Sequence, residues 1–474
     1  MFFLVLFILF ISLMSVPHLG GQGIELPNSL SIWFLVSVFI LASIWKAINK
    51  SAFYVHRALL VFLLFLWVTF LASVINSQLT QREISLYFYA FVVLSLFPMA
   101  VLQWQIRHSG LLSVLKFIVA IGLFHSIVSI IQVHDKLKIW HSLTGYAPLN
   151  CNCSSPIGVI QQTNLHSSFM SLVVIASIYL MSYKGFWTSS AFVRWLIVIS
   201  ATLSLYSLLL GSSRAGMLGL ILGVFLLLFS CDKGVLKNKK YLMMLLSIFV
   251  TSLLLNQYFP NDAASNLIQK TEQLFLGLDV RIDIYLATIH MIIDRPVLGY
   301  GLGSFPDELS LYINNSAEMY SESTYEVMRK VSHPHNEFLL WAFNAGLVFI
   351  IGFLIFIYRY LMTIQWRRWR FLLGVISISL PLIIQSLVSL PFFISALHLF
   401  LLMFLVVYSL RGSQKELCKL HLGVRLVKSI KIIIILFIGA LVFAYVTQLV
   451  EIWGLYEAYE KETNRFLINQ LKSI

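Results

Sequence analysis

The chain has 474 residues, of which 59% are hydrophobic and 11% are charged, and its mean hydropathy is +0.87. A water-soluble protein carries roughly a quarter charged residues, so this composition excludes a soluble globular protein. The apolar residues gather in runs of about 18 to 22, which is long enough to cross a bilayer core of about 30 Å. The sequence therefore predicts an all-α polytopic membrane protein.

Thirteen apolar segments are candidate transmembrane helices, at about 2–17, 30–46, 58–76, 86–104, 110–133, 160–182, 194–211, 215–230, 241–258, 337–358, 371–390, 393–410 and 432–450. The first segment lacks a basic n-region and a good cleavage site, so we expect an uncleaved anchor. The expected organisation, in chain order, is nine helices in 1–258, a large loop with amphipathic helices in 259–336, four helices in 337–450 and a short amphipathic tail in 451–474.

The net charge of +13 would fit a nucleic-acid-binding protein, but the distribution of the charges excludes that interpretation. One set of loops holds twenty of the 33 basic residues and only two acidic residues. The opposite set holds twelve basic residues and the other eighteen acidic residues. Because Lys and Arg resist translocation, the basic set is cytoplasmic. The N-terminus is therefore expected in the cytoplasm, and the large loop and the C-terminus on the outer side.

The large external loop has two features that predict local structure. Residues 280–294 carry isoleucine and leucine at helical spacing, which indicates an amphipathic helix on the membrane or on the bundle. Gly299, Gly301 and Gly303 follow it. A glycine-rich loop can bind phosphate, but no strand precedes this one, so we expect a turn that closes the helix instead.

The cysteines do not indicate a metal centre. Cys151 and Cys153 lie in an external loop, where oxidation is feasible, but a disulfide across a single residue would be strained. No external histidine pattern completes a tetrahedral site with them, so no metal is expected. Their redox state stays open.

The spans offer little chemistry for a transporter. A transporter needs ionisable side chains or broken helices near the middle of the bilayer. The spans contain His125, Gln385 and His398 but no carboxylate well inside a span, and we expect these three side chains to be hydrogen-bonded within the bundle. Polar residues gather instead at the external ends of spans, which predicts an active site at the outer surface of the membrane.

Two arginines at this surface need an anionic partner. Arg214 lies in a tight turn between two spans, and Arg281 lies in the large loop. The partner of Arg214 is either a lipid phosphate or a bound diphosphate, which the planar guanidinium holds with several charge-assisted bonds. The same choice applies to Arg281, although Asp283 could instead hold it in an ion pair.

His335 is the natural general base of such a site. Neutral imidazole accepts a proton near neutral pH, and removing a proton from an acceptor hydroxyl is worth about 10²–10⁴ in rate. His333 is a weaker candidate that could orient His335. The structural alternative is a helix start at which Asn336 is the N-cap and Glu337 lies beside the positive helix end.

These motifs resemble a known family. Residues 332–341, SHPHNEFLLW, together with Gly346, are similar to the His-Pro-His-Asn-Glu signature of bacterial protein O-oligosaccharyltransferases of the pilin type, within the O-antigen ligase and polymerase superfamily. Residues 158–164 resemble the family's Gly…Gln-x-Asn segment, 211–214 its Gly-Ser-Ser-Arg turn, and 281–301 the start of its periplasmic loop.

The resemblance implies a GT-C-like glycosyltransferase of the bacterial inner membrane that works without a metal ion or other cofactor. It would move a glycan en bloc from undecaprenyl diphosphate to Ser or Thr hydroxyls of exported proteins such as pilin, with inversion at the anomeric carbon. Arg214 and Arg281 would bind the diphosphate, and His335 would activate the acceptor. Gln162 and Asn164 would line the donor or acceptor site.

Other functions stay open at this point. The short segment after the last span is also compatible with an O-antigen ligase, whose acceptor is lipid A core, and with an O-antigen polymerase, whose acceptor is another glycan repeat. A transporter of lipid-linked oligosaccharide is the alternative from a different class. The sequence does not identify the acceptor, the glycan or the oligomeric state.

Overall fold

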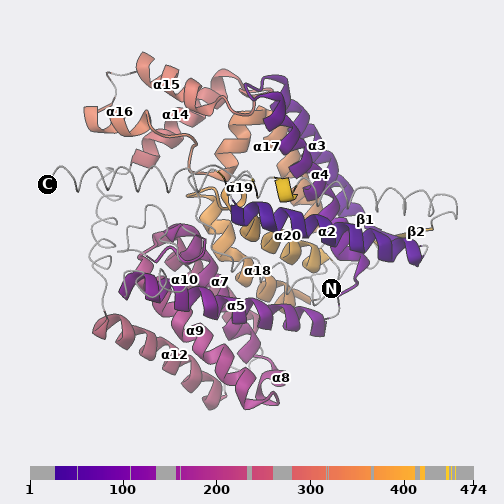
Figure 1. Cartoon of the computed structure of the whole chain (residues 1–474), viewed down its shortest axis with the longest axis vertical. Coiled ribbons are helices and arrows are strands. Elements are labelled where there is room, and N and C mark those ends of the chain that lie inside the picture. Colours follow the sequence, from indigo (N-terminus) through magenta and orange to yellow (C-terminus); the bar gives the residue numbers. More distant parts are fainter. Residues whose placement is uncertain are drawn as a thin grey trace.

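The computed structural model describes residues 27–50, 52–106, 108–134, 156–160, 162–231, 238–259, 280–316, 318, 320–363, 368–410, 417–421, 445–447, 450 and 454 (Figure 1). The expected first span lies outside these residues, as do most of the expected last span and of the tail. Gln161, Cys151 and Cys153 also lie outside them.

The described elements are mostly helices. In chain order they are α2 (Pro27–Asn49), β1 (Ala52–His56), α3 (Arg57–Ile75), α4 (Gln81–Gln103), α5 (His108–His134), α7 (Thr163–Met181), α8 (Lys184–Trp187), α9 (Ala191–Gly211), α10 (Arg214–Ser230), α12 (Lys239–Tyr258), α14 (Val280–Asp294), α15 (Phe305–Asn315), α16 (Glu322–Met328), α17 (Glu337–Thr363), α18 (Trp369–Ser386), α19 (Pro391–Ile394), α20 (Ala396–Leu410) and β2 (Leu417–His421).

The prediction of an all-α polytopic membrane protein is confirmed. Within the described part of the chain, nine helices are long and apolar enough to cross a membrane, namely α2, α3, α4, α5, α7, α9, α12, α17 and α18. The shorter helices α10 and α20 are also apolar. These eleven helices coincide with eleven of the thirteen expected spans.

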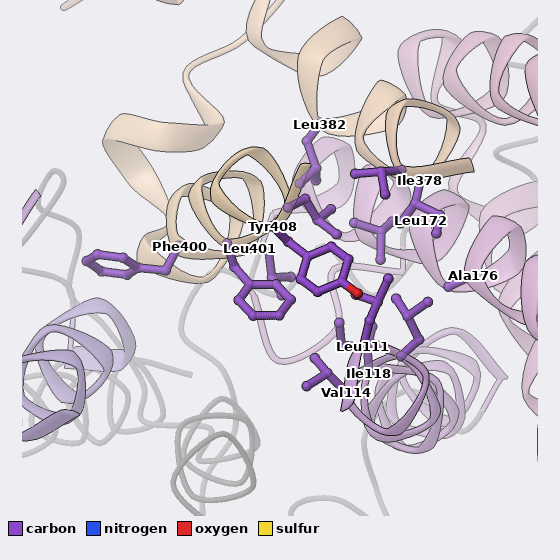
Figure 2. Close-up of a cluster of buried hydrophobic side chains, with 14 of the residues drawn as sticks. Leu111, Val114, Ile118, Leu172, Ala176, Ile378, Leu382, Phe400, Leu401 and Tyr408 are labelled. Atoms are coloured by element: carbon purple, nitrogen blue, oxygen red, sulfur yellow. The ribbon is translucent and has the colours of Figure 1, made fainter. Parts of the chain in front are cut away.

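Helix α7 forms the centre of one half of the bundle. In its apolar, membrane-crossing stretch 94% of the residues are buried. It packs against α5, α9, α10 and α18. Figure 2 shows apolar side chains from α5, α7, α18 and α20 meeting in one cluster, in which Leu111, Leu172, Leu382 and Leu401 are labelled. On the other side of α18, α3 packs along α17 (Figure 1). Helix α18 thus connects the two halves.

Glycines allow α10 to approach α18 closely. A Cβ atom on Gly219 would lie 2.8 Å from Cα of Pro381, and one on Gly223 would lie 3.0 Å from the carbonyl oxygen of Ser377. The residue number rises along α10 as it falls along α18, so the two helices run antiparallel. The start of α10 therefore lies beside the end of α18.

Two short strands pair where the sequence predicted only loops. Strand β1 lies antiparallel to β2, with Ala52 opposite His421 and His56 opposite Leu417. The side-chain amide of Gln103 extends this pairing, because it accepts from the N–H of Tyr54 at 2.9 Å and donates to its carbonyl at 2.8 Å. Each strand has only five residues, so neither produces a signal in hydropathy. Both belong to the basic loops expected on the cytoplasmic side.

The glycine run is a structural joint between α3 and α17. The N–H groups of Tyr300 and Gly301 donate to the carbonyls of Phe343 and Asn344 at 2.9 and 3.1 Å. The N–H of Leu302 donates to the carbonyl of Ser73 at 2.9 Å. These N–H groups are therefore committed to protein carbonyls. This favours the expected turn over a phosphate-binding loop.

The segment before the glycine run contacts α17 at a kink in that helix. Gly346 has φ +59° and ψ −143° inside the helix, and the N–H of Leu347 donates to the carbonyl of Pro296 at 2.6 Å. Pro296, two residues after the end of α14 at Asp294, is thereby attached to α17. Helix α14 is therefore held to the bundle at a defined position.

The expected amphipathic helix in 280–294 is present as α14, but its buried face is not the apolar stripe that predicted it. Its buried residues Ile284, Ala287 and Met291 belong to a small core that it shares with α15, α16 and Phe343 of α17. The apolar stripe that predicted the helix is exposed, and it consists of Ile282, Leu286, Ile289 and Ile293. Each of these four side chains is at least 40% exposed in the part of the chain that the structure describes.

Replacing Gly299 by alanine should destabilise the fold. Its φ is +67°, and the new Cβ would lie 2.3 Å from the carbonyl oxygen of Phe343. The left-handed backbone alone costs about 1–3 kcal/mol for a non-glycine residue. Thermal unfolding in detergent should show a clearly lower Tm. The matched control is Gly185→Ala, because nothing lies within 4 Å of that Cβ position. An equal Tm in both variants would contradict the account of the joint.

Candidate functional site

Three helix ends meet at one end of the bundle and bring expected site residues together. They are the starts of α7 and α10 and the end of α18. Ser171 of α7 donates to the carbonyl of Gly216 at 2.8 Å, and Gly216 has no room for a side chain against Ser167. With α18 antiparallel to α10, the turns that carry Asn164, Arg214 and Gln385 lie at the same level.

Asn164 is part of the turn that presents Arg214. The hydroxyl of Ser213 donates to Oδ1 of Asn164 at 3.3 Å and accepts from the N–H of Gly216 at 3.3 Å. Ser213 is thus the N-cap of α10, and Arg214 is the first residue of that helix, half-buried. A helix N-terminus and a guanidinium at the same place both favour a bound anion.

Gln162 lies at the start of α7, in the N-cap position, without a side-chain capping bond. Its Oε1 is buried and has no hydrogen-bond partner within the described part of the chain. Buried amides are normally hydrogen-bonded, so this oxygen is available to a ligand or a water molecule. That fits the expectation that Gln162 lines a binding site, which stays a prediction.

Asn336 connects α17, α18 and α14. Its Oδ1 accepts from the N–H of Leu339 at 3.0 Å, so the expected N-cap of α17 is confirmed. Its amide donates to the carbonyl of Leu387 at 2.9 Å, and the hydroxyl of Tyr285 donates to the same carbonyl at 3.3 Å. Tyr285 lies one helical turn after Arg281 on α14. Arg281 is therefore carried by a helix that is fixed to the end of α18.

His335 has an unusual backbone conformation between these elements. Its φ is +51°, which few residues other than glycine adopt. Among the described residues, Ser212 (φ +46°) and Gln105 (φ +45°) share this property, and Ser212 directly precedes the N-cap of α10. Two of the three strained positions thus flank the site. Such strain is concentrated at functional sites, which supports a role for His335.

His333 lies against His335. The ring centroids are 4.4 Å apart with an interplanar angle of 76°, and the N–H of His335 donates to Nδ1 of His333 at 3.4 Å. Burial lowers the pKa of His333, although a backbone hydrogen bond opposes the shift. A neutral His333 adds no positive charge beside His335. The arrangement agrees with His333 as an orienting partner.

Arg281 and Asp283 occupy positions on α14 that do not favour an ion pair. Residues two apart on a helix point in different directions. Burial raises the pKa of Asp283, whereas a paired guanidinium would lower it. Arg281 is half-buried on the helix that Tyr285 fixes. The alternative in which Asp283 neutralises Arg281 is therefore disfavoured.

Glu337 is a site residue whose contacts sequence reasoning missed. It is buried, and its Oε1 accepts from the N–H groups of Phe392 and Phe393 at 2.8 Å each. The carboxylate thus caps the short helix α19 and ties it to the start of α17. The sequence predicted only a favourable position at the start of the helix, because a contact across 55 residues leaves no local signal.

A large apolar cavity lies on the other side of α18. Its volume is about 930 Å³, and α3, α4, α17, α18, α19 and α20 form its walls. Aromatic side chains dominate its middle, including Phe62, Phe65, Phe349 and Phe353. At the level of the candidate site its lining includes Glu83, Glu337 and Leu387. The cavity and the polar site therefore meet at the end of α18.

The three span residues expected to be hydrogen-bonded differ in outcome. Nε2 of His398 lies 3.1 Å from the carbonyl of Leu165, and its Nδ1 lies 2.8 Å from the hydroxyl of Ser395, as expected. For His125 the expectation is wrong, because its ring stacks near His166 with centroids 6.4 Å apart and its two ring nitrogens make no hydrogen bond in the described residues. For Gln385 the expectation is also wrong, because neither polar atom of its side chain has a hydrogen-bond partner in the described part of the chain.

The lowered pKa of His333 predicts that acid destabilises the protein. The unfolded chain takes up a proton on this residue below about pH 6.5, while the folded protein resists it. Stability is thus retained above that pH and falls as the pH decreases further. His333→Asn keeps an acceptor for the N–H of His335 but does not titrate. The decrease in Tm between about pH 7.5 and 5.5 should be smaller in this variant, and an identical decrease would contradict the assignment.

Comparison with known proteins places part of the chain in a functional context. Residues 199–357 match a family model described as O-antigen ligase, about a third of the chain. No curated protein and no solved structure matches the chain. The matched segment runs from α9 into α17 and includes Arg214, Arg281 and His335. This similarity supports the expected superfamily and a ligase-type membrane protein that transfers glycans.

Proposed function

We propose that the protein moves a glycan en bloc from undecaprenyl diphosphate to Ser or Thr hydroxyls of exported proteins, such as pilin, in the periplasm. The observation that carries the proposal is the segment that matches the O-antigen ligase model. It contains the three residues expected to do the chemistry, Arg214, Arg281 and His335. They lie on elements joined at the end of α18, beside a large apolar cavity.

The cavity supports a lipid-linked donor. A polyprenyl chain is apolar, and an aromatic-lined cavity of about 930 Å³ within the membrane can take part of it. The diphosphate would then lie at the end of α18, where the starts of α10 and α17 meet. A soluble sugar nucleotide would gain nothing from this cavity.

Charge at the site fits the proposed donor. Arg214 at the positive end of α10 and Arg281 on α14 would neutralise much of a diphosphate. As the bond from the anomeric carbon to the phosphate oxygen breaks, negative charge grows on that oxygen, and both guanidinium groups stabilise it. This is the charge development that a glycosyl transfer from a diphosphate requires.

His335 would complete the reaction. Its neutral imidazole takes the proton from the acceptor hydroxyl as the oxygen attacks the anomeric carbon. The new glycosidic bond forms on the face opposite the leaving diphosphate, so the anomeric configuration inverts. The proton ends on the imidazole, and the carrier diphosphate leaves. The proposal involves no metal ion.

The proposed orientation places the N-terminus in the cytoplasm and the C-terminus and the site in the periplasm, with the protein in the inner membrane. The pairing of β1 with β2 supports it, because two loops with an excess of basic residues then lie on one side. They lie at the end of α3 and α20 that is far from Asn336 and the site. Only one end of the bundle then needs access to exported acceptors.

A second acceptor class is supported by a specific observation. The matching family model is described as O-antigen ligase, and ligation to lipid A core uses the same donor and the same site chemistry. A deletion strain examined for both glycoprotein and O-antigen on lipopolysaccharide separates the two. Loss of glycoprotein alone supports the protein acceptor, and loss of polymeric O-antigen supports ligase or polymerase activity.

His335→Ala and Arg281→Ala should abolish acceptor glycosylation in a complemented deletion strain. Removing the general base alone should lower the transfer rate by about 10²–10⁴. Lys240→Ala is the control, because Lys240 is exposed at the far end of α12 and should retain full transfer. Immunoblots must show equal protein in the membrane. Normal glycosylation in either site variant would rule out the proposed site.

A further inference from the structure

Gln385 is a wholly buried amide that the fold does not use. The side chain lies in the last turn of α18 with 0% exposure, and neither its nitrogen nor its oxygen has a hydrogen-bond partner in the described residues. Burying an amide without partners opposes folding. The side chain is therefore available to a ligand or a water molecule.

Two other buried glutamines show what a purely structural role looks like. The amide of Gln103 donates to the carbonyls of Tyr54 and Met99 at 2.8 Å and accepts from the N–H of Tyr54. Gln132 accepts from the N–H of Gly158 at 2.8 Å and donates to its carbonyl at 3.3 Å. Both are satisfied by protein backbone. Gln385 differs from them although all three side chains are at most 5% exposed.

The packing of α18 on α10 directs Gln385 toward the start of α10. Pro381 faces Gly219, and Gln385 lies one helical turn further along the same face of α18. Because the helices are antiparallel, the residue one turn before Gly219 is Ala215. Gln385 therefore faces the first turn of α10, which Arg214 begins.

Further unsatisfied polar atoms lie around this turn. Oγ of Ser167 and Oε1 of Gln162 are buried without hydrogen-bond partners in the described part of the chain. Ser167 is adjacent to both ends of the turn, since a Cβ on Gly211 would lie 2.8 Å from its Oγ and one on Gly216 would lie 2.9 Å from its Cβ. Unsatisfied polar atoms at the start of α7 thus lie beside the turn that Gln385 faces.

We propose that Gln385 binds the phosphate oxygens of the donor together with Arg214, its amide N–H groups donating to the anion at the start of α10. This inference rests on the proposed function and adds a binding residue to the same site. The shared chemistry is a phosphate anion attached to a lipid. The amide oxygen remains available to a hydroxyl of the first sugar.

The path from the cavity fits this role. Ile383, Ser386 and Leu387 of the last turn of α18 line the apolar cavity, whereas Gln385 lies on the opposite face of the same turn. A donor with its prenyl chain in the cavity would carry its head group around the end of α18. Its phosphates would then meet Arg214 on one side and Gln385 on the other.

Binding measurements on purified protein in nanodiscs test the inference, with undecaprenyl diphosphate as the probe and inorganic pyrophosphate as the competitor. Gln385→Leu keeps the size of the side chain and removes both polar atoms. We expect the Kd to rise at least about tenfold, with no loss of Tm, because no hydrogen bond of the fold is lost. Gln385→Glu should raise the Kd further, since a carboxylate would repel the diphosphate.

Gln103→Leu is the matched control. It removes another buried amide, one with three hydrogen bonds, so it should lower Tm and leave the Kd unchanged. A Kd for Gln385→Leu within twofold of the parent would overturn the inference. So would a decrease in Tm as large as that of Gln103→Leu, because it would show a structural role.

The remaining outcomes distinguish failure of the proposed function from failure of the role of Gln385. If the parent protein does not bind undecaprenyl diphosphate, the proposed function itself fails. If the parent and Gln385→Leu bind equally, only the role of Gln385 fails. Nanodiscs with and without phosphatidylglycerol identify the source of the bound phosphate. If phosphatidylglycerol competes with the probe in the parent protein but not in Gln385→Leu, the site binds a bilayer headgroup. That result would overturn the assignment to the donor.

Discussion

The close antiparallel contact of α10 with α18 is the constraint on which the candidate site depends. Gly219 and Gly223 remove the side chains that would hold the helices apart, and Gly216 does the same toward α7. Helix packing in a bilayer relies on such small residues, because lipid tails are as apolar as a leucine side chain. The contact sets the start of α10, and hence Arg214, beside the end of α18. Every other element of the site is attached to one of these two ends.

The same contact gives α18 one polar and one apolar face at its end. One face of α18 packs on α7 and α10 and carries Gln385, while the other lines the aromatic cavity. Asn336 and Tyr285 both donate to the carbonyl of Leu387 at the end of α18, so they fix α17 and α14 to the boundary between these faces. An amphipathic donor with a long apolar chain and a charged head group needs this combination.

Much of this could be predicted from the sequence, because the strongest signals were local. Runs of apolar residues predicted eleven helices that the structure describes, and the residue pattern at 335–337 predicted an N-cap at Asn336. The amphipathic pattern of α14 also predicted a helix correctly. The glycine run was correctly interpreted as a turn, since it lacked the strand that a phosphate-binding loop requires.

The features that were missed depend on contacts between distant residues. The pairing of β1 with β2 joins positions more than 350 residues apart and involves five residues on each side. Glu337 caps α19 across 55 residues, and no local pattern reveals this. Gln385 was expected to be satisfied within the bundle, as His398 is. Its surroundings are set by the antiparallel packing of α10 on α18, a contact between distant segments that leaves no local signal.

The central claim is that one protein transfers a glycan from a lipid diphosphate to a hydroxyl at this site. The most direct measurement is a reaction in detergent that contains only the purified protein, an undecaprenyl-diphosphate-linked glycan and an acceptor protein, followed by NMR of the new linkage. The account predicts glycosylated acceptor whose anomeric configuration is opposite to that of the donor. Absence of product from a protein that still moves the lipid-linked glycan across a proteoliposome membrane would contradict it, and would identify a transporter instead.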